Sequence, residues 1–180
     1  MRQHESDGGG IAGMARLSTA HMEELVGFRV TGLSAEPFAH LFGLPEEDLS
    51  KYGAKRYVAN EKPGFPCRIE MRDAEPGETV LLLNHIYQPA DTPYRGMHAI
   101  FVREGATDTY DQVNQIPEVM RVRLLSLRGF DMTGMMLDAD VVEGAQVEQV
   151  IERMFSNPDI SYIHAHNAKR GCYSGRIDRA

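Results

Sequence analysis

The sequence predicts an α+β fold in which residues 23–180 form a single domain with a mainly antiparallel or mixed β-sheet. The first observation is that strand-like and short helix-like segments follow one another without the regular alternation that builds a parallel sheet. The second is a pair of strongly apolar segments, 79–83 and 97–103, which are typical of central strands. The third is one longer amphipathic helix, at about 145–155, with apolar side chains at helical spacing.

The first third of the expected domain combines short strands with short helices. Alternating apolar and polar residues predict a strand at 28–31. Residues that begin and end helices predict two short ones, at 34–43 and 45–53. Further strands are expected at 55–60 and 67–71, on either side of the rigid loop Lys62-Pro63-Gly64-Phe65-Pro66.

The middle of the chain contains a long expected loop, 85–96, between the two central strands. Loops of this length in a compact domain are often functional. A short helix from 117 to about 124 and a strand at 126–130 follow.

The last third begins with segment 135–142, where apolar and acidic residues alternate. We expect Leu137, Ala139 and Val141 to face the core and Asp138 and Asp140 to face away from it. Asn157-Pro158 ends the helix at 145–155. Two strands, at 161–167 and 172–177, complete the expected fold.

Composition and charge limit the function classes. The 180 residues contain 19 Lys and Arg against 26 Asp and Glu, a net charge of −7, which argues against a broad nucleic-acid-binding surface. No apolar run approaches the roughly 20 residues of a membrane-spanning helix. Residues 1–22 lack the apolar core of a signal peptide, so we expect a flexible or dispensable leader and a cytoplasmic protein.

Two histidines near the C-terminus are the first candidates for chemistry. In a strand at 161–167, Tyr162, His164 and His166 share one face, which lets both imidazoles converge on one ligand. That ligand is either an anion or a metal ion. For a metal, further ligands would come from His98, Cys172, Asp138 or His85. The alternative is that one histidine is a buried structural residue and the other is solvated.

The C-terminal segment after these histidines is basic. Residues 169–180 contain one acidic residue, Asp178, and four basic residues: Lys169, Arg170, Arg176 and Arg179. A basic corner on an acidic protein is suited to a small carboxylate or phosphate, and Arg95 and Arg68 could add paired hydrogen bonds to it. The alternative is a solvated tail whose basic residues pair with acidic ones nearby.

The two cysteines have different surroundings in the sequence. Cys172 follows a Lys-Arg-Gly turn, where positive charge favours a thiolate, and His164 or His166 could activate it as a nucleophile. Cys67 is expected to be a small buried residue. In a reducing cytoplasm both should remain thiols rather than form a Cys67–Cys172 disulfide.

Four segments, taken together, resemble one protein family: KPGFPCR at 62–68, DAEPGETVLLLN at 73–84, TPYRGMHAIFVREG at 92–105 and HAHNAKRGCY at 164–173. They occur in the order found in the bacterial domain-of-unknown-function family 1203, and the resemblance extends from about Phe28 to Ala180. It implies a small soluble cytoplasmic protein, and it supplies no reaction, cofactor or catalytic residue.

The leading hypothesis is a pocket that binds or transforms a small anionic molecule. Its expected catalytic residues are His98, His164, His166 and Cys172, and its expected ligand-binding residues are Tyr94, Arg95, Asn167 and Arg170. Such a pocket predicts that replacing His164 by alanine leaves folding nearly intact. The alternatives are a non-catalytic interaction module that uses the acidic helix at 145–155 and a metal-binding protein that uses His164 and His166; no particular cofactor is indicated.

Overall fold

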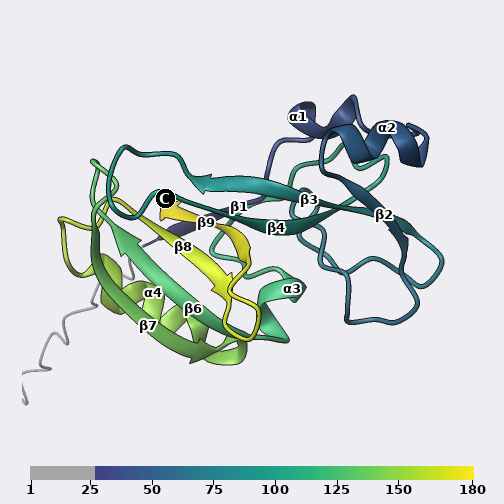
Figure 1. Cartoon of the computed structure of the whole chain (residues 1–180). Coiled ribbons are helices and arrows are strands. Elements are labelled where there is room, and N and C mark those ends of the chain that lie inside the picture. The colour runs from purple at the N-terminus through teal and green to yellow at the C-terminus, as the bar shows by residue number, and fades with distance from the viewer. Residues whose placement is uncertain (1–26) are drawn as a thin grey trace, which may run out of the picture.

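The computed structural model describes residues 27–180, whose strands form two antiparallel sheets (Figure 1). The expected leader at 1–22 lies outside the described residues. The larger sheet has six strands in the order β5-β1-β9-β8-β6-β7, and the smaller has three in the order β2-β3-β4. The mainly antiparallel α+β expectation is confirmed, although the strands divide between two sheets instead of one.

Most helices are short, and more residues lie in strands than in helices. The strands of the larger sheet are β1 (Phe28–Thr31), β5 (Asp111–Val113), β6 (Leu124–Phe130), β7 (Met136–Glu143), β8 (Tyr162–Asn167) and β9 (Tyr173–Arg179). Those of the smaller sheet are β2 (Lys55–Val58), β3 (Thr79–Gln88) and β4 (Gly96–Arg103). The helices are α1 (Glu36–Ala39), α2 (Glu46–Lys51), α3 (Glu118–Arg121) and α4 (Val147–Phe155), the last preceded by the 3-10 turn Gly144–Gln146.

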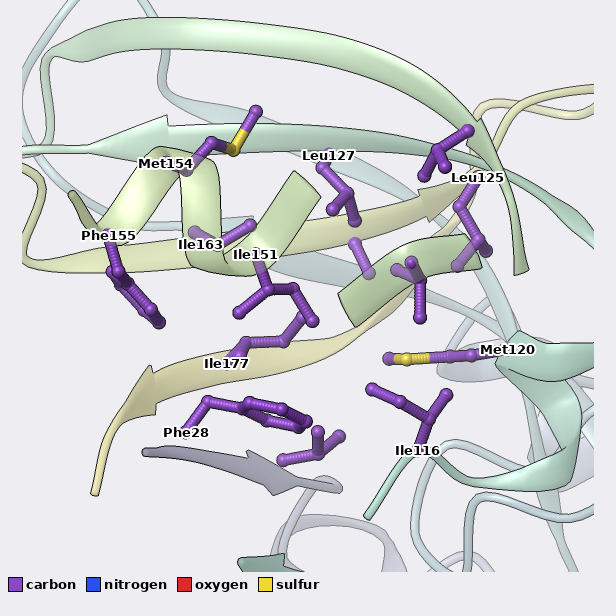
Figure 2. Packing of buried hydrophobic residues seen from close by; sticks show 14 of the residues in the cluster. Phe28, Ile116, Met120, Leu125, Leu127, Ile151, Met154, Phe155, Ile163 and Ile177 are labelled. Carbon is purple, nitrogen blue, oxygen red and sulfur yellow. The ribbon is translucent and has the colours of Figure 1, made fainter. Parts of the chain in front are cut away.

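The main core lies between one face of the larger sheet and α4. Figure 2 shows Ile151 of α4 beside Ile163 of β8 and Ile177 of β9, all fully buried. Burial of such side chains contributes about 1.5–3 kcal/mol each. The helix is shorter than the expected 145–155 because its first turn is 3-10.

The β3–β4 hairpin lies over the other face of the larger sheet. Tyr87 of β3 contacts His166 of β8, and the side-chain amide of Gln88 donates a hydrogen bond to the hydroxyl of Tyr162 at 2.9 Å. A second core forms on the hairpin's side of the molecule, between the smaller sheet and the two N-terminal helices; it includes Phe38 and Leu49. The larger sheet is therefore covered on both faces, which is why all six residues of β8 are buried.

Two expected segments are wrong. The residues at 67–71 do not form a strand; Cys67 makes only an isolated bridge to Phe101, and Met71 has a φ of 51°. The expected loop at 85–96 is shorter, because β3 continues to Gln88 and β4 begins at Gly96. The hairpin strands extend further than the apolar pattern indicated because the extra residues pair with each other across the hairpin.

The predicted orientation of β7 is also wrong. Arg153 of α4 pairs with Asp138 at 2.7 Å and with Asp140 at 2.9 Å, so both aspartates face the helix. Leu137 and Val141 are 46% and 57% exposed. The face of β7 that carries both aspartates also carries Val142, which packs in the main core, so alternation alone could not tell which face lies toward α4. Across residues 27–180 no helix has both the length and the apolar composition needed to cross a membrane.

Candidate functional site

The turn between β8 and β9 holds two of the expected site residues side by side. The backbone N–H of Asn167 donates to the backbone carbonyl oxygen of Cys172 at 2.9 Å, and the backbone N–H of Gly171 donates to the backbone carbonyl oxygen of Asn167 at 2.7 Å. Gly171 has a φ of 73°, in the left-handed region that favours glycine. The Lys-Arg-Gly sequence thus closes a tight turn that fixes Asn167 opposite Cys172.

His164 and His166 lie on the same face of β8, as the strand prediction requires, but they are buried among aromatic rings. Their ring centroids are 6.3 Å apart. Tyr87 lies 4.8 Å from His166 and 6.4 Å from His164, and Tyr173 lies 5.3 Å from His164 and 5.8 Å from His166. We call this group, which fills the space between the two sheets, the histidine cluster: Tyr87, Phe130, Tyr162, His164, His166 and Tyr173.

The environment of the cluster keeps both imidazoles neutral. Burial, with the charges of His166 and Arg176 adding to it, lowers the pKa of His164 to about 3. Burial and the charge of Arg128 lower the pKa of His166 to about 4. The Nδ1 of His166 lies 3.0 Å from the carbonyl oxygen of Gly171, so this nitrogen carries the proton and donates. The Nε2 of His166 and the Nδ1 of His164 are buried with no hydrogen-bond partner in the described part of the chain.

A cavity of about 600 Å³ lies at the other side of the β8–β9 turn, between that turn, β4 and the loop before Cys67. We call it the Arg68 cavity. Its polar lining combines four basic side chains with a histidine, an amide and a thiol: Arg68, Arg123, Lys169, Arg170, His98, Asn167 and Cys172, with Glu61 as the acidic residue. Its apolar lining is Pro63, Phe65, Pro66, Leu82, Ala99, Phe101, Val122 and Leu124, together with Gly64.

Arg68 is the most unusual residue of the cavity, because its guanidinium is only 2% exposed yet faces no carboxylate. Its Nε donates to the carbonyl oxygen of Tyr173 at 2.9 Å, and its Nη1 donates to that of Pro66. Its Nη2 donates to the Sγ of Cys172 at 3.0 Å. None of the ion pairs within residues 27–180 includes Arg68, and burial lowers its pKa. A buried positive charge with only neutral acceptors is unfavourable by several kcal/mol unless something compensates it.

The sulfur of Cys172 accepts from two side chains at once. Besides Arg68, the Nδ2 of Asn167 lies 3.4 Å from it. Asn167 is itself 8% exposed, and its Oδ1 has no hydrogen-bond partner among the residues described. Cys67 differs: it is 1% exposed, and its sulfur accepts one hydrogen bond, from the backbone N–H of Arg103 at 3.3 Å. The two cysteines are not joined to each other in the structure.

The basic C-terminal segment divides between the cavity and the rest of the sheet. Arg176 pairs with Asp178 at 2.7 Å, and Arg179 donates to backbone carbonyls near the end of α4. Lys169 and Arg170, at the cavity, are exposed and form no ion pair within residues 27–180. They are therefore available to a ligand.

Arg123 and His98 complete the polar lining. Arg123 pairs with the buried carboxylate of Asp73 at 2.6 Å, which compensates much of its charge. The Nδ1 of His98 donates a hydrogen bond to the carbonyl oxygen of Ala99 at 3.1 Å. A Cβ placed on Gly171 would lie 4.0 Å from the Nε2 of His98, so this imidazole lies next to the β8–β9 turn.

A family model described as "Protein of unknown function (DUF1203)" matches residues 64–179. The chain belongs to this family. The resemblance seen in the sequence is confirmed, although the match begins at Gly64 and not near Phe28, so that β1, α1, α2 and β2 precede it. All residues that line the Arg68 cavity except Glu61 and Pro63 lie inside the DUF1203 match. No curated protein and no solved structure matches the chain.

The expected site residues of this DUF1203 protein separate into two groups. His98, Asn167, Arg170 and Cys172 line the Arg68 cavity. His164 and His166 do not line it, because strand alternation turns them toward the histidine cluster. Tyr94 packs on Phe130, with ring centroids 6.2 Å apart, and Arg95 is exposed in the β3–β4 loop; neither lines the cavity.

Sequence reasoning missed part of the lining. Leu82 lies on β3, Phe101 on β4 and Arg123 between α3 and β6, and no local pattern connects them to the turn at 167–172. A signal was present for the loop at 62–66, whose Pro and Gly residues predict a rigid segment, but nothing indicated what that segment covers.

The metal interpretation of His164 and His166 finds no support in the geometry. Among the described residues, no group of three or more His, Cys, Asp or Glu side chains is arranged to hold a metal ion. Of the further ligands considered, His98 and Cys172 line the cavity, Asp138 pairs with Arg153 of α4, and His85 packs on the rings of Phe38 and Tyr173. The rings that surround the two imidazoles are mainly aromatic carbon.

Proposed function

We propose that the protein binds a small anionic molecule in the Arg68 cavity. The observation that carries the proposal is the buried guanidinium of Arg68, which has no carboxylate partner in the described chain and lies on the cavity wall. A carboxylate or phosphate in the cavity would compensate this charge and accept hydrogen bonds from the guanidinium N–H groups that Tyr173, Pro66 and Cys172 leave free.

The surrounding charges support the same ligand class. Lys169 and Arg170 are exposed at the cavity and unpaired within residues 27–180, whereas Glu61 is the acidic residue of the lining. This local excess of positive charge stands against a net charge of −7 for the whole chain. A concentrated basic site on an acidic protein draws small anions to that site while repelling them elsewhere.

The apolar lining suggests the rest of the ligand. Phe65 and Phe101 form a ring pair with centroids 5.3 Å apart, and Leu82 also lines the cavity. A hydrophobic wall beside a few convergent polar groups is typical of small-molecule sites. The preferred ligand therefore has one carboxylate or phosphate group on an apolar or aromatic body.

Thermal and calorimetric titrations test the proposal with three probes: inorganic phosphate, phenyl phosphate and benzoate. We expect phenyl phosphate to bind more tightly than phosphate, and a probe at 100 times its Kd to stabilise the fold by about 2.7 kcal/mol. Replacing Lys169 and Arg170 together by alanine should weaken binding about tenfold, since each exposed ion contact is worth ~0.7 kcal/mol.

The matched control is the double variant Arg29→Ala/Lys51→Ala. It removes the same amount of charge from exposed positions on β1 and α2, where the pairs with Asp111 and Asp48 are at the surface. We expect its affinities to equal those of the unmodified chain. Absence of binding for all three probes, or equal losses in both double variants, would overturn the proposed function.

A further inference from the structure

The sulfur of Cys172 faces the same cavity in an arrangement that suits a nucleophile. A neutral thiol is a weak hydrogen-bond acceptor, yet two donors are directed at this sulfur, the Nη2 of Arg68 at 3.0 Å and the Nδ2 of Asn167 at 3.4 Å. The two contacts fix the position of the sulfur at the cavity wall, next to the space that a bound ligand would occupy.

The side chain of Asn167 gives an independent indication that a ligand completes the site. Asn167 lines the cavity and is 8% exposed, but its Oδ1 is buried with no hydrogen-bond partner among residues 27–180. An unfilled buried acceptor is unfavourable by about 1–3 kcal/mol. A ligand that donates a hydrogen bond next to Cys172 would fill it.

We propose that Cys172 is a nucleophile that forms a covalent bond with an anionic electrophile held in the Arg68 cavity. This rests on the proposed anion site, which would bring the reactive carbon of the ligand to the sulfur. The thiol proton passes to solvent, a sulfur lone pair forms the new C–S bond, and the leaving group departs from the carbon with its bonding electron pair. Arg68 and Asn167 are positioning residues that hold the sulfur.

The chain contains its own reference thiol. Cys67 is the other of the two cysteines; it does not line the cavity, and its sulfur meets a single backbone donor. Iodoacetate and iodoacetamide both alkylate thiolates with loss of iodide, and they differ in that only iodoacetate is an anion. The ratio of their rates at each cysteine therefore reports whether that sulfur lies in an anion-attracting site.

The experiment alkylates the full folded chain with each reagent at one pH and measures both cysteines by mass spectrometry, with the urea-unfolded chain as reference. We expect Cys172 to react in the folded chain and Cys67 to be protected. At Cys172 the iodoacetate-to-iodoacetamide rate ratio should exceed that of the unfolded chain about tenfold, as attraction into a charged cleft provides.

Three variants separate the thiol from the anion site. Asn167→Ser should slow both reagents at Cys172, because it removes a donor to the sulfur. Lys169→Ala/Arg170→Ala should slow iodoacetate alone, because it removes two exposed positive charges from the lining of the Arg68 cavity. Arg68→Lys should also slow both reagents at Cys172. If the Arg68→Lys protein does not fold, Asn167→Ser alone tests the contribution of the donors to the sulfur.

The possible failures are distinguishable. If Cys172 in the folded chain is as protected as Cys67 while phenyl phosphate still binds, the nucleophile is refuted and the anion site stands. If the rate ratio at Cys172 equals that of the unfolded chain and the phosphate probes also fail to bind, both the nucleophile for anions and the proposed function are refuted.

Discussion

The histidine cluster and the Arg68 cavity lie on either side of one hairpin turn, and both bury polar atoms that have no hydrogen-bond partner among the residues described. They differ in what surrounds those atoms. In the cluster, aromatic rings enclose His164 and His166, and burial keeps both imidazoles neutral. In the cavity, a buried guanidinium and exposed cations surround Asn167 and Cys172.

The difference shows how one short segment can serve two purposes. His164, His166 and Asn167 are neighbours in sequence, but the first two contribute to packing between the sheets, and the third contributes to a cavity. A polar residue in a strand therefore acquires its role from the element packed against it. For the histidines that element is β3, through Tyr87; for Asn167 it is the turn that carries Cys172.

The largest difference between the two regions is expected in the free energy of unfolding, when a histidine of the cluster is replaced by alanine. His166→Ala should lower the free energy of unfolding by about 2–4 kcal/mol, because it leaves a hole among packed rings. His164→Ala should behave similarly, since His164 is 3% exposed; this replaces the expectation from sequence that its loss would be nearly neutral. Urea denaturation measures both.

His98→Ala is the matched control for this prediction. It removes the same side chain from a half-buried position on the cavity wall and should change the free energy of unfolding by less than about 1 kcal/mol. Equal losses at His98 and His166 would remove the distinction between the two regions.

The second effect is a pH dependence that comes mainly from the cluster, although burial also lowers the pKa of His85 beside it. The unfolded chain binds protons at its histidines below pH 6.5, whereas the folded chain does so only near the lowered pKa values of about 4 and about 3. Stability is therefore retained above pH 6.5 and lost as the pH falls toward 4, by up to ~1.4 kcal/mol per pH unit for each histidine.

Thermal unfolding between pH 7 and pH 5 measures this slope. The lowered pKa of Glu78, about 2, affects stability only below its ordinary value of 4.5 and so lies outside this range. His164→Gln should reduce the slope, and His98→Ala should not. An unchanged slope in His164→Gln would mean that the cluster does not exclude protons in the folded state.

A smaller effect is expected from the turn that joins the two regions. Gly171→Ala should cost about 1 kcal/mol, because alanine is strained at a φ of 73°. The nearest atom to the new Cβ is the His98 Nε2 at 4.0 Å, so there is no clash. Gly43→Ala is the control: its φ is 78°, with nothing within 4 Å, and it lies away from the cavity.

Both glycine variants should lose similar stability, measured by urea denaturation, but only Gly171→Ala should slow alkylation of Cys172. If Gly43→Ala slows it equally, the turn is not what positions the sulfur.

The smallest effect is expected at a residue that sequence reasoning assigned to the ligand. Arg95 is exposed in the β3–β4 loop and does not line the cavity. Arg95→Ala should change the free energy of unfolding by no more than about 0.5 kcal/mol and leave the Kd for phenyl phosphate unchanged. A weakening equal to that of Lys169→Ala/Arg170→Ala would extend the anion site to the hairpin loop.

Much of the fold could be read from local patterns. The extended nature of 162–167 follows from alternation, and the apolar segments of β3 and β4 follow from their composition. The orientation of β7 could not be read in this way, because it depends on which face packs toward α4, where Val142 joins the core and Arg153 reaches Asp138 and Asp140.

The amino-acid sequence by itself determined that this chain is an α+β protein with a mainly antiparallel or mixed sheet and that it belongs to the DUF1203 family, since strand alternation and the family's motifs are local properties. It also determined that Asn167, Arg170 and Cys172 share one turn, because only a few residues separate them. Only the tertiary structure decided that Arg68, 104 positions from Cys172, contacts its sulfur and that the two histidines face a different space. The physical reason is that burial and charge at a site are set by whichever elements pack against it, and these come from distant parts of the chain.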